Sequence, residues 1–237
     1  MNKSYLESFI SKYHLGGLIS NVIWRVKDNK LSTTFTTEGK EMLGHVVFDD
    51  FKYDNADLGI VDTERLSRML SVLNGECEVI YQRMEERVIA MTLKDGNAEV
   101  KFNLGDLSIF PDETRLKNEP EYNALLKMNA DSASAFVNGC NAITETNHFT
   151  VVSDGDNCEL IVNYDKTKNL DMVRVPVTIV SGGDVEEIAF SSLHLRSIIS
   201  ANKGADIALK VSGQGLMKCI FTTKEYTSEY YLVAMDK

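Results

Sequence analysis

Apolar positions along this chain alternate between two spacings, one typical of helices and one typical of strands. Residues 4–13 place Leu6, Phe9 and Ile10 on one helical face, and two glycines follow this segment. The spacing predicts a helix there. The next segments are rich in β-branched and aromatic residues and are separated by turn residues. They predict strands over residues 22–26, 31–36 and 42–48.

A second short amphipathic helix is predicted after these strands. Asp62 or Thr63 is suited to cap its start, and Asn74-Gly75 ends it. Its buried stripe consists of Leu66, Met69, Leu70 and Leu73. Further strands are predicted beyond this helix, over residues 77–82, 87–93 and 98–104.

The same order of elements recurs in the second half of the chain. A helix capped by Asp131 runs through Ile143, and another helix is predicted at about residues 192–201. Pro176 lies inside a strand pattern and lacks a backbone N–H, so its strand is predicted at a sheet edge. Strands are predicted over residues 124–128, 148–152, 159–164, 172–180, 187–190, 207–211, 217–222 and 230–235.

Two segments of the chain repeat one device, a short amphipathic helix closed by glycine and followed by strands. They are residues 66–75 and 195–204, and they lie about 130 positions apart, which is the size of one small domain. Residues 110–122 between the halves are polar, bracketed by prolines and without period, as in an extended linker. The sequence therefore predicts an α+β duplication with domains at 1–109 and 123–237.

Composition places this duplication among globular proteins of a reducing compartment. No apolar run approaches the roughly 20 residues that span a bilayer, and the first ten residues carry Glu7 and no continuous apolar core. We therefore expect no membrane partner and a cytoplasmic, intracellular location. The cysteines fall singly and never as a Cys-x-x-Cys pair, which indicates buried thiols at Cys77, Cys140, Cys158 and Cys219.

No motif of bond chemistry is present in the sequence. It contains no phosphate loop, no G-x-S-x-G elbow, no His-Glu-x-x-His and no paired cysteine ligands. Asp154 and Asp156 are the best candidates for a cation site, but a D-G-D-N cluster between strands is typical of a hairpin turn. The sequence predicts that this protein is not an enzyme and holds no metal and no cofactor.

The charges are more informative by position than by sum. The formal net charge is −10, which taken alone argues against nucleic acid, although an acidic body with a basic channel has the same sum. Cations recur on the predicted helices, and side chains three or four apart share a helix face. Solvated surface is the alternative interpretation of these cations. The candidates are Lys3, Lys12, Arg65, Arg68, Arg196 and Lys203.

The whole pattern resembles the DNA polymerase sliding clamps, namely proliferating cell nuclear antigen and the trimeric clamps of tailed bacteriophages. The resemblance covers nearly the entire chain. It is carried by the terminal strand Tyr-Tyr-Leu-Val-Ala at 230–234, by the helix end Leu-x-x-Met-Leu-Ser-x-Leu-Asn-Gly at 66–75, and by Met-Leu-Gly-His-Val at 42–46.

The resemblance implies a mechanism without bond chemistry. Six such units form a ring around duplex DNA, so a chain with two units implies a homotrimer with helices lining the pore and sheets outside. The helix cations named above are then the pore residues, and their contacts to phosphate are independent of sequence. The predicted third helix departs from the family because it has no Lys or Arg. Its polar face offers Ser132, Ser134, Asn138 and Asn141 instead.

The resemblance also implies partners and the surfaces that hold them. A DNA polymerase and a clamp loader are expected to dock peptides in an apolar pocket between the linker and the last strand. By matching positions, this pocket involves Met42, His45, Ile109, Phe110, Pro111, Tyr231, Val233 and Ala234. The subunit interface is expected to pair the edge strand at 98–104 with the edge at 172–180 of a neighbour, helped by Val100, Phe102, Val173 and Val175.

Three other functions stay open at the level of sequence. A monomeric viral processivity factor shares the clamp fold and binds DNA without encircling it. A hydrolase or carbohydrate-binding protein rich in β-structure needs convergent carboxylates, for which Asp154 and Asp156 are the candidates. An assembly protein shares the exposed sheet edges but has no DNA function.

Overall fold

The computed structural model describes residues 1–114 and 116–235, which form two compact units. Unit 1 contains residues 1–37, 44–114 and 224–228, and unit 2 contains the described residues of 38–43, 115–223 and 229–237. The predicted linker includes Arg115 and the predicted second domain includes residues 236–237, and these positions lie outside the described residues.

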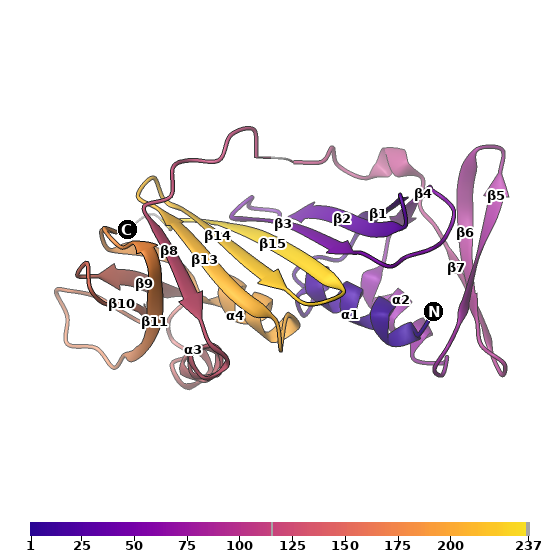
Figure 1. Cartoon of the computed structure of the whole chain (residues 1–237). Coiled ribbons are helices and arrows are strands. Elements are labelled where there is room, and N and C mark those ends of the chain that lie inside the picture. The colour runs from indigo at the N-terminus through magenta and orange to yellow at the C-terminus, as the bar shows by residue number, and fades with distance from the viewer. Residues whose placement is uncertain (115, 236–237) are drawn as a thin grey trace. The chain divides into compact units, whose positions relative to one another are not determined.

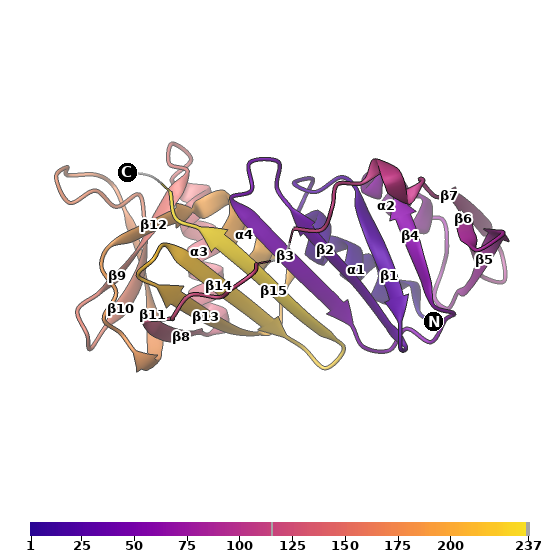
Figure 2. The same cartoon turned by 90° about the horizontal axis from the view of Figure 1, so that it is seen from above.

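Unit 1 is a pair of helices on one face of a sheet, with a second small sheet beside it (Figure 1). The strand order is β3-β2-β1-β4 in the first sheet (Figure 2) and β5-β6-β7 in the second. Its elements are α1 (Lys3–His14), β1 (Val22–Lys27), β2 (Lys30–Thr36), β3 (Met42–Phe48), which begins in unit 2, β4 (Ala56–Ile60), α2 (Thr63–Leu70), β5 (Glu78–Met84), β6 (Arg87–Lys94), β7 (Glu99–Asn103) and the short 3-10 helix η1 (Leu107–Ile109).

Strand β4 corrects the sequence-based prediction of three strands between the first two helices. It pairs antiparallel with β1, with Trp24 opposite Leu58. Its last three residues, 58–60, are all buried, so the strand lacks the alternation of buried and exposed positions that identifies half-buried strands.

An aromatic cluster fills the core of unit 1. Trp24 is fully buried, and the rings of Phe9 and Tyr13 from α1 contact it edge-on at centroid distances of 5.5 and 6.3 Å. The predicted cap of α2 is confirmed, because the Asp62 carboxylate accepts a hydrogen bond from the Arg65 backbone N–H at 2.7 Å. The amphipathic period of both helices thus fixes which face packs on the sheet.

Unit 2 repeats this plan with a helix pair on one face of a longer sheet (Figure 1). The strand order is β12-β9-β10-β11-β8-β13-β14-β15. Its elements are β8 (Ala124–Met128), α3 (Ala130–Ala142), β9 (His148–Ser153), β10 (Cys158–Val162), β11 (Val173–Gly182), β12 (Ile188–Ser191), α4 (Ser192–Ala201), β13 (Asp206–Ser212), β14 (Leu216–Thr222) and β15 (Tyr226–Val233), which begins in unit 1.

Two local predictions for unit 2 need correction. Helix α3 is capped by Asn129, whose side chain accepts from the Ser132 N–H at 2.7 Å, and Asp131 lies in its first turn. Strand β11 is not a simple edge, because residues 173–177 pair with β10 and residues 178–182 pair with β8. Each half has one partner among the described residues, which leaves an unpaired side at Pro176.

The predicted end of α2 at Asn74-Gly75 is wrong, because the helix ends at Leu70 with Ser71 as its C-cap. Gly75 and Gly204 follow α2 and α4 with φ of +62° and +80°, which glycine adopts without steric cost. Two other local predictions are confirmed. The D-G-D-N cluster is the turn between β9 and β10, where the Asp154 carboxylate accepts from the Asn157 backbone N–H at 2.7 Å. The four cysteines are free and buried.

Candidate nucleic-acid and partner surfaces

The helix face of unit 1 carries three exposed or partly exposed cations. Arg65 is exposed on α2 and has no side-chain partner among the described residues. Arg68, one turn on, pairs with Glu64 at 2.6 Å, and Lys3 on α1 pairs with Glu7 at 3.2 Å. Such exposed pairs contribute little to stability and leave the cation able to exchange partners. The arrangement fits weak contacts to polyanions.

Lys12 does not belong to this surface, which corrects its predicted role. Its side chain is buried, with 5% of the residue exposed, and its ammonium lies 4.8 Å from the centroid of the Tyr226 ring. Burial lowers the pKa of Lys12 below its ordinary value. The helical period places residue 12 close to Phe9, on the side of α1 that the sheet covers, so Lys12 stabilises the unit rather than facing solvent.

The helix face of unit 2 is hollowed where α3 begins and α4 ends. The hollow has a volume of about 890 Å³, and Lys127 of β8 and Lys203 after α4 bring two positive charges to its lining, with Asp206 as the opposing charge. Ser134 and Asn138 of α3 also line it. Sequence reasoning did not single out Lys127, because it lies on a strand. The pairing of β8 with β13 brings it to the same hollow as Lys203.

The predicted polar face of α3 divides in the structure. Ser134, Asn138 and Asn141 are exposed, whereas the Ser132 hydroxyl donates a hydrogen bond to the Pro176 carbonyl of β11 at 2.9 Å. The Asn141 side-chain oxygen accepts a hydrogen bond from Arg196 of α4 at 3.1 Å. Arg196 is therefore held on the helix pair of unit 2, while Lys203 is exposed beyond its end.

The predicted partner pocket has residues in both units, and their exposure differs. In unit 1, Ile109 is 65% exposed, and Phe110 and Pro111 line a small cleft of about 80 Å³ against β1 and β2. His45 is half-buried, and its Nδ1 lies 3.0 Å from the Thr34 hydroxyl. Of these unit 1 residues, Ile109 presents the most exposed apolar side chain to solvent.

In unit 2 the exposed member of the predicted pocket is Val233, at 48%. Ala234 beside it is half-buried, and Tyr231 is buried except for 9%. Met42 is completely buried, so its predicted contact with a partner is corrected to a core position. Residues 230–232 of β15 are buried without alternation, and exposure begins at Val233, the last residue of the strand.

The linker reaches unit 2 through a charged cluster that sequence reasoning missed. Lys218 of β14 is buried, and its Nζ lies 2.8 Å from Glu119 and 3.2 Å from Glu229. The Tyr231 hydroxyl donates to the same Glu119 oxygen at 2.7 Å, and Tyr122 donates to the other one at 3.1 Å. The Glu119 carboxylate therefore accepts three hydrogen bonds. Two of the donors, Lys218 and Tyr231, lie 99 and 112 residues away along the chain.

The pKa values in this cluster follow from these contacts. Burial alone lowers the pKa of Lys218, but its hydrogen bonds to Glu119, Tyr231 and Glu229 outweigh burial and raise it above its ordinary value. The hydrogen bond from Lys218 is the largest cause that lowers the pKa of Glu119. Burial raises the pKa of Tyr231 to about 12. These directions favour a charged Lys218 beside an ionised Glu119, with Tyr231 as a neutral phenol at neutral pH.

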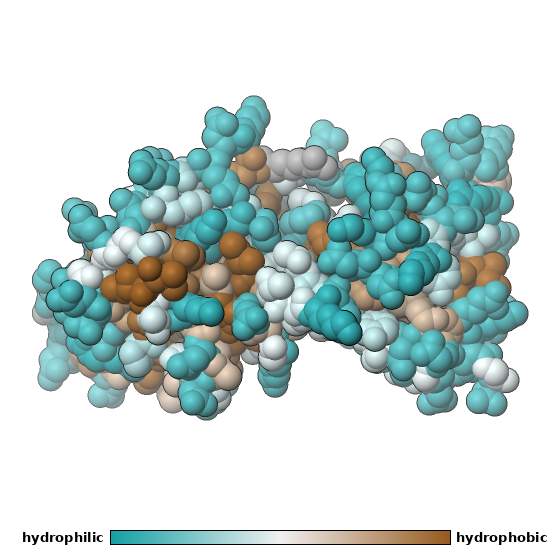
Figure 3. All heavy atoms as spheres, viewed as in Figure 1, coloured by the Kyte–Doolittle hydropathy of each residue, from teal (hydrophilic) through white to brown (hydrophobic). Residues whose placement is uncertain are grey.

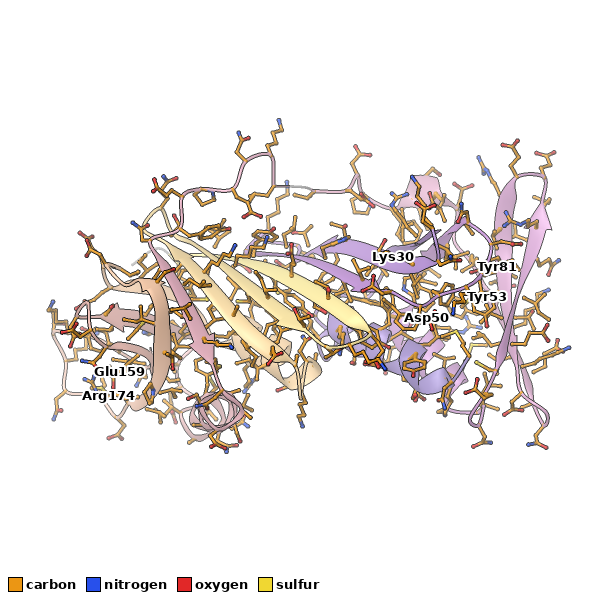
Figure 4. All side chains as sticks on the ribbon, viewed as in Figure 1. Lys30, Asp50, Tyr53, Tyr81, Glu159 and Arg174 are labelled. Carbon is orange, nitrogen blue, oxygen red and sulfur yellow. The ribbon has the colours of Figure 1, made fainter. Side chains whose placement is uncertain are left out.

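The predicted interface side chains are corrected by burial. Val100 and Phe102 of β7 and Val175 of β11 are 6%, 3% and 0% exposed, and they belong to the cores of their units. Val173 faces α3, because a Cβ placed on Gly139 would lie 2.8 Å from its Cγ1. On the outer face of β11, Arg174 pairs with Glu159 of β10 at 2.7 Å (Figure 4), and Val180 is 55% exposed.

Strand β7 leaves its outer backbone edge unpaired within the described residues, since it is the last strand of the β5-β6-β7 sheet. Leu104 N donates to Ile89 O and Asp95 N donates to Ala98 O. Hydrogen-bonded pairs alternate along an antiparallel ladder, so Val100 and Phe102 bond with β6. The N–H groups of Glu99, Lys101 and Asn103 point away from β6 and are free to pair with another strand.

Two classes of site receive no support from the described residues. Residues 1–114 and 116–235 contain no group of three or more His, Cys, Asp or Glu side chains placed to hold a metal ion. None of the helices described there has the length and apolar character needed to cross a membrane. Apolar residues do gather on the viewed face of unit 2, around β10 and β11 (Figure 3).

Comparisons with known proteins identify the fold. No protein-family model matches the chain, and no curated protein matches it. It is similar to PCNA of A. fulgidus with the C-terminal region of FEN-1 bound, with 18% identity, a TM-score of 0.81 and coverage of 100% of this chain and 97% of that one. It is also similar to the proliferating cellular nuclear antigen of Entamoeba histolytica, with 15% identity, a TM-score of 0.75 and coverage of 99% and 96%. The predicted α+β clamp fold is confirmed.

Proposed function

We propose that this chain is a sliding clamp, a processivity factor that encircles duplex DNA during replication and tethers the polymerase. The observation that carries the proposal is the PCNA-like fold over the whole chain, with helix pairs that present exposed cations on a protein of net charge −10. The acidic body repels DNA, and the helix faces are the favourable place for it. This function needs no bond chemistry, and we propose none.

The DNA contact is proposed to be weak and independent of sequence. Arg65, Arg68 and Lys3 of unit 1 supply point charges that exchange between neighbouring phosphates. In unit 2 we assign the same role to Arg196, Lys203 and Lys127, with the amides and hydroxyls of α3 donating hydrogen bonds. Topological closure then supplies the processivity that affinity does not.

The ring is proposed to be a homotrimer held through strand edges. The outward N–H groups of β7 fit an unpaired side of β11 in a neighbouring copy, and main-chain hydrogen bonds carry this contact. Pro176 shortens the ladder because it has no N–H to donate. A short contact suits a ring that a clamp loader must open, as in the trimeric clamps of tailed bacteriophages.

Partner docking is proposed near the exposed apolar residues of the linker region and the last strand. Ile109 and Val233 are the exposed members of the predicted pocket. Support comes from the A. fulgidus structure, in which a protein segment, the C-terminal region of FEN-1, is bound to the PCNA. The partners proposed here are a polymerase and a loader, in the cytoplasm of the cell or of a viral host.

The decisive measurement is mass in solution by equilibrium sedimentation. The expected result is a species of three times 26.5 kDa that dissociates on dilution. A monomer at the highest concentrations would contradict the ring, and DNA binding by such a monomer would favour the monomeric processivity factor instead. Extension of long primed circular templates with and without the chain then tests the function itself.

A single backbone change tests the strand contact. Lys101→Pro removes an N–H that points away from β6, so the unit folds and the trimer dissociates to monomers. Lys101→Ala keeps this N–H and removes the same side chain, so it is the matched control and stays trimeric. A trimer that persists in Lys101→Pro would mean that the copies meet through another surface.

A further inference from the structure

The linker is attached to unit 2 by side chains rather than by its backbone. Residues 116–122 make no backbone–backbone hydrogen bond with another described residue. Its contacts with the rest of the unit are those of Glu119 with Lys218 and Tyr231, and the Tyr122 ring near Lys210, whose Nζ is 5.6 Å from the ring centroid. Within the linker, the Tyr122 hydroxyl also donates to Glu119. Main-chain bonds begin only at Asn123, which donates to Val211 and accepts from Gly183, so residues 116–122 are held in place by side-chain contacts that another ligand can replace.

The surface beneath Glu119 is shaped for one carboxylate. Lys218 is buried, with 7% of the residue exposed, and the Tyr231 hydroxyl beside it is also a donor. A buried ammonium that loses a carboxylate pays a large desolvation penalty unless another anion replaces it. Glu229, on β15, is a second partner of Lys218 at 3.2 Å and does not depend on the position of the linker.

We propose that Lys218, Tyr231 and Glu229 form a carboxylate seat that the linker occupies through Glu119, and that an acidic side chain of an extended partner peptide takes its place. Val233, two residues beyond Tyr231 on the chain, is 48% exposed and offers an apolar contact for a neighbouring side chain of that peptide. The linker is then an internal competitor, and partner binding releases it. The inference deepens the proposed docking of partners, but its test needs neither DNA nor a ring.

The probe for this seat is the segment that already fits it. A fluorescein-labelled peptide with the sequence of residues 117–123 is titrated against the full chain and followed by anisotropy. The linker in the chain has an effective concentration in the millimolar range, so the wild-type chain binds the peptide poorly. In Glu119→Gln the internal carboxylate is absent, and we expect the peptide to bind at least tenfold more tightly.

Two matched controls isolate the carboxylate. A second peptide with Gln in place of the glutamate at position 119 is expected to bind neither chain. Glu121→Gln makes the same change of charge two positions along the linker, at a side chain with no partner among the described residues, and is expected to behave as wild type. Lys218→Met in the Glu119→Gln background is expected to abolish binding of the first peptide.

The outcomes separate the proposal from its alternatives. Equal binding of the peptide to wild type and Glu119→Gln overturns it, and so does equal binding of the Glu and Gln peptides. A gain in Glu121→Gln as large as in Glu119→Gln assigns the effect to overall linker charge and also overturns it. The comparison of the Glu and Gln peptides uses chains in which Lys218 is unchanged, so it tests the proposal even if Lys218→Met does not fold.

Discussion

The helix pairs of the two units occupy the same place in their units but present different chemistry. In unit 1 the pair presents Arg65, Arg68 and Lys3, two of them balanced by glutamates one turn away. In unit 2 the pair has a neutral α3 with Ser134 and Asn138 beside a hollow that Lys127 and Lys203 line. The buried stripes, in contrast, are mainly apolar in both units, although Lys12 is buried in unit 1 and His194 in unit 2.

This difference shows that packing constrains the buried positions of the repeat more than the exposed ones. A buried position must match its neighbours in volume and polarity, because protein interiors are close-packed and buried polar groups need partners. An exposed position has only to suit water and a polyanion, and an arginine, a lysine on an adjacent strand or an amide all do so. The two units therefore agree in their cores and differ in how they can reach phosphate.

The largest expected effect tests the shared cores. Phe9→Ala in unit 1 and Phe149→Ala in unit 2 each remove a fully buried ring that meets another ring edge-on. Each is expected to lower the free energy of unfolding by about 3–5 kcal/mol. Urea unfolding followed by circular dichroism measures both changes, and Trp24, the sole tryptophan, reports unit 1 by fluorescence.

The control for this pair is Val233→Ala, which truncates an exposed side chain and is expected to change the free energy by less than about 0.5 kcal/mol. A loss below about 1 kcal/mol for either phenylalanine would mean that the two cores do not contribute equally. The two units would then differ in their cores as well as in their exposed helix faces.

The second prediction tests the two helix faces against each other. Arg65→Glu with Arg68→Glu changes unit 1, and Lys127→Glu with Lys203→Glu changes unit 2. Each pair is expected to reduce the slope of log affinity for duplex DNA against log salt by about 2, because each cation releases about one counterion. Thermal stability should hardly change, since exposed charges contribute little to folding.

Lys52→Glu with Lys94→Glu is the matched control, because these exposed lysines lie in the β3–β4 loop and on β6 rather than on a helix. Its salt slope should equal that of wild type. If only the unit 1 pair changes the slope, the hollow of unit 2 does not contact phosphate, and the two units differ in function as well as in charge.

Which features the sequence could predict follows the same division. The helical stripes, the cap at Asp62 and the glycines at 75 and 204 are local signals, so the elements and the fold could be anticipated. Strand β4 was not predicted because its last three residues are all buried and show no alternation. Burial depends on which face of a strand meets the core, a tertiary property that no local pattern contains.

The candidate site was less predictable for the same reason. Lys12 lies on a helix like Lys3, and although the helical period places it near Phe9, its ring contact with Tyr226 of β15 is tertiary. Val100 and Phe102 were assigned to an interface, but the register of β7 turns them inward. The seat of Glu119 joins residues about a hundred positions apart, which spacing along the chain cannot indicate.

The third prediction separates a buried cation from an exposed one. Lys12→Ala removes a packed side chain and its contact with Tyr226, so it should lower the free energy of unfolding by about 1–3 kcal/mol while the salt slope of DNA binding stays unchanged. Lys12→Met keeps most of the packed stem and should recover much of the loss. A reduced salt slope in either variant would show that Lys12 reaches DNA.

The smallest expected effect is the pH dependence of the linker seat in unit 2. The hydrogen bond from Lys218 holds the pKa of Glu119 below its ordinary value, and burial opposes this only in part. A carboxylate whose folded pKa is lowered stabilises the fold above its unfolded pKa, near 4.3, and loses this contribution as the pH falls through the folded value.

The raised pKa of Lys218 keeps the ammonium charged throughout this range. The stability difference between wild type and Glu119→Gln is expected to be at most about 1 kcal/mol, because the Glu119 side chain is 39% exposed to solvent although Lys218 is buried. It should stay constant from about pH 7 to pH 5 and shrink below about pH 4. Urea unfolding at a series of pH values measures it, and Glu121→Gln should follow wild type throughout. A difference that persists at pH 2 would mean that the glutamate stabilises the linker by packing and not by its charge.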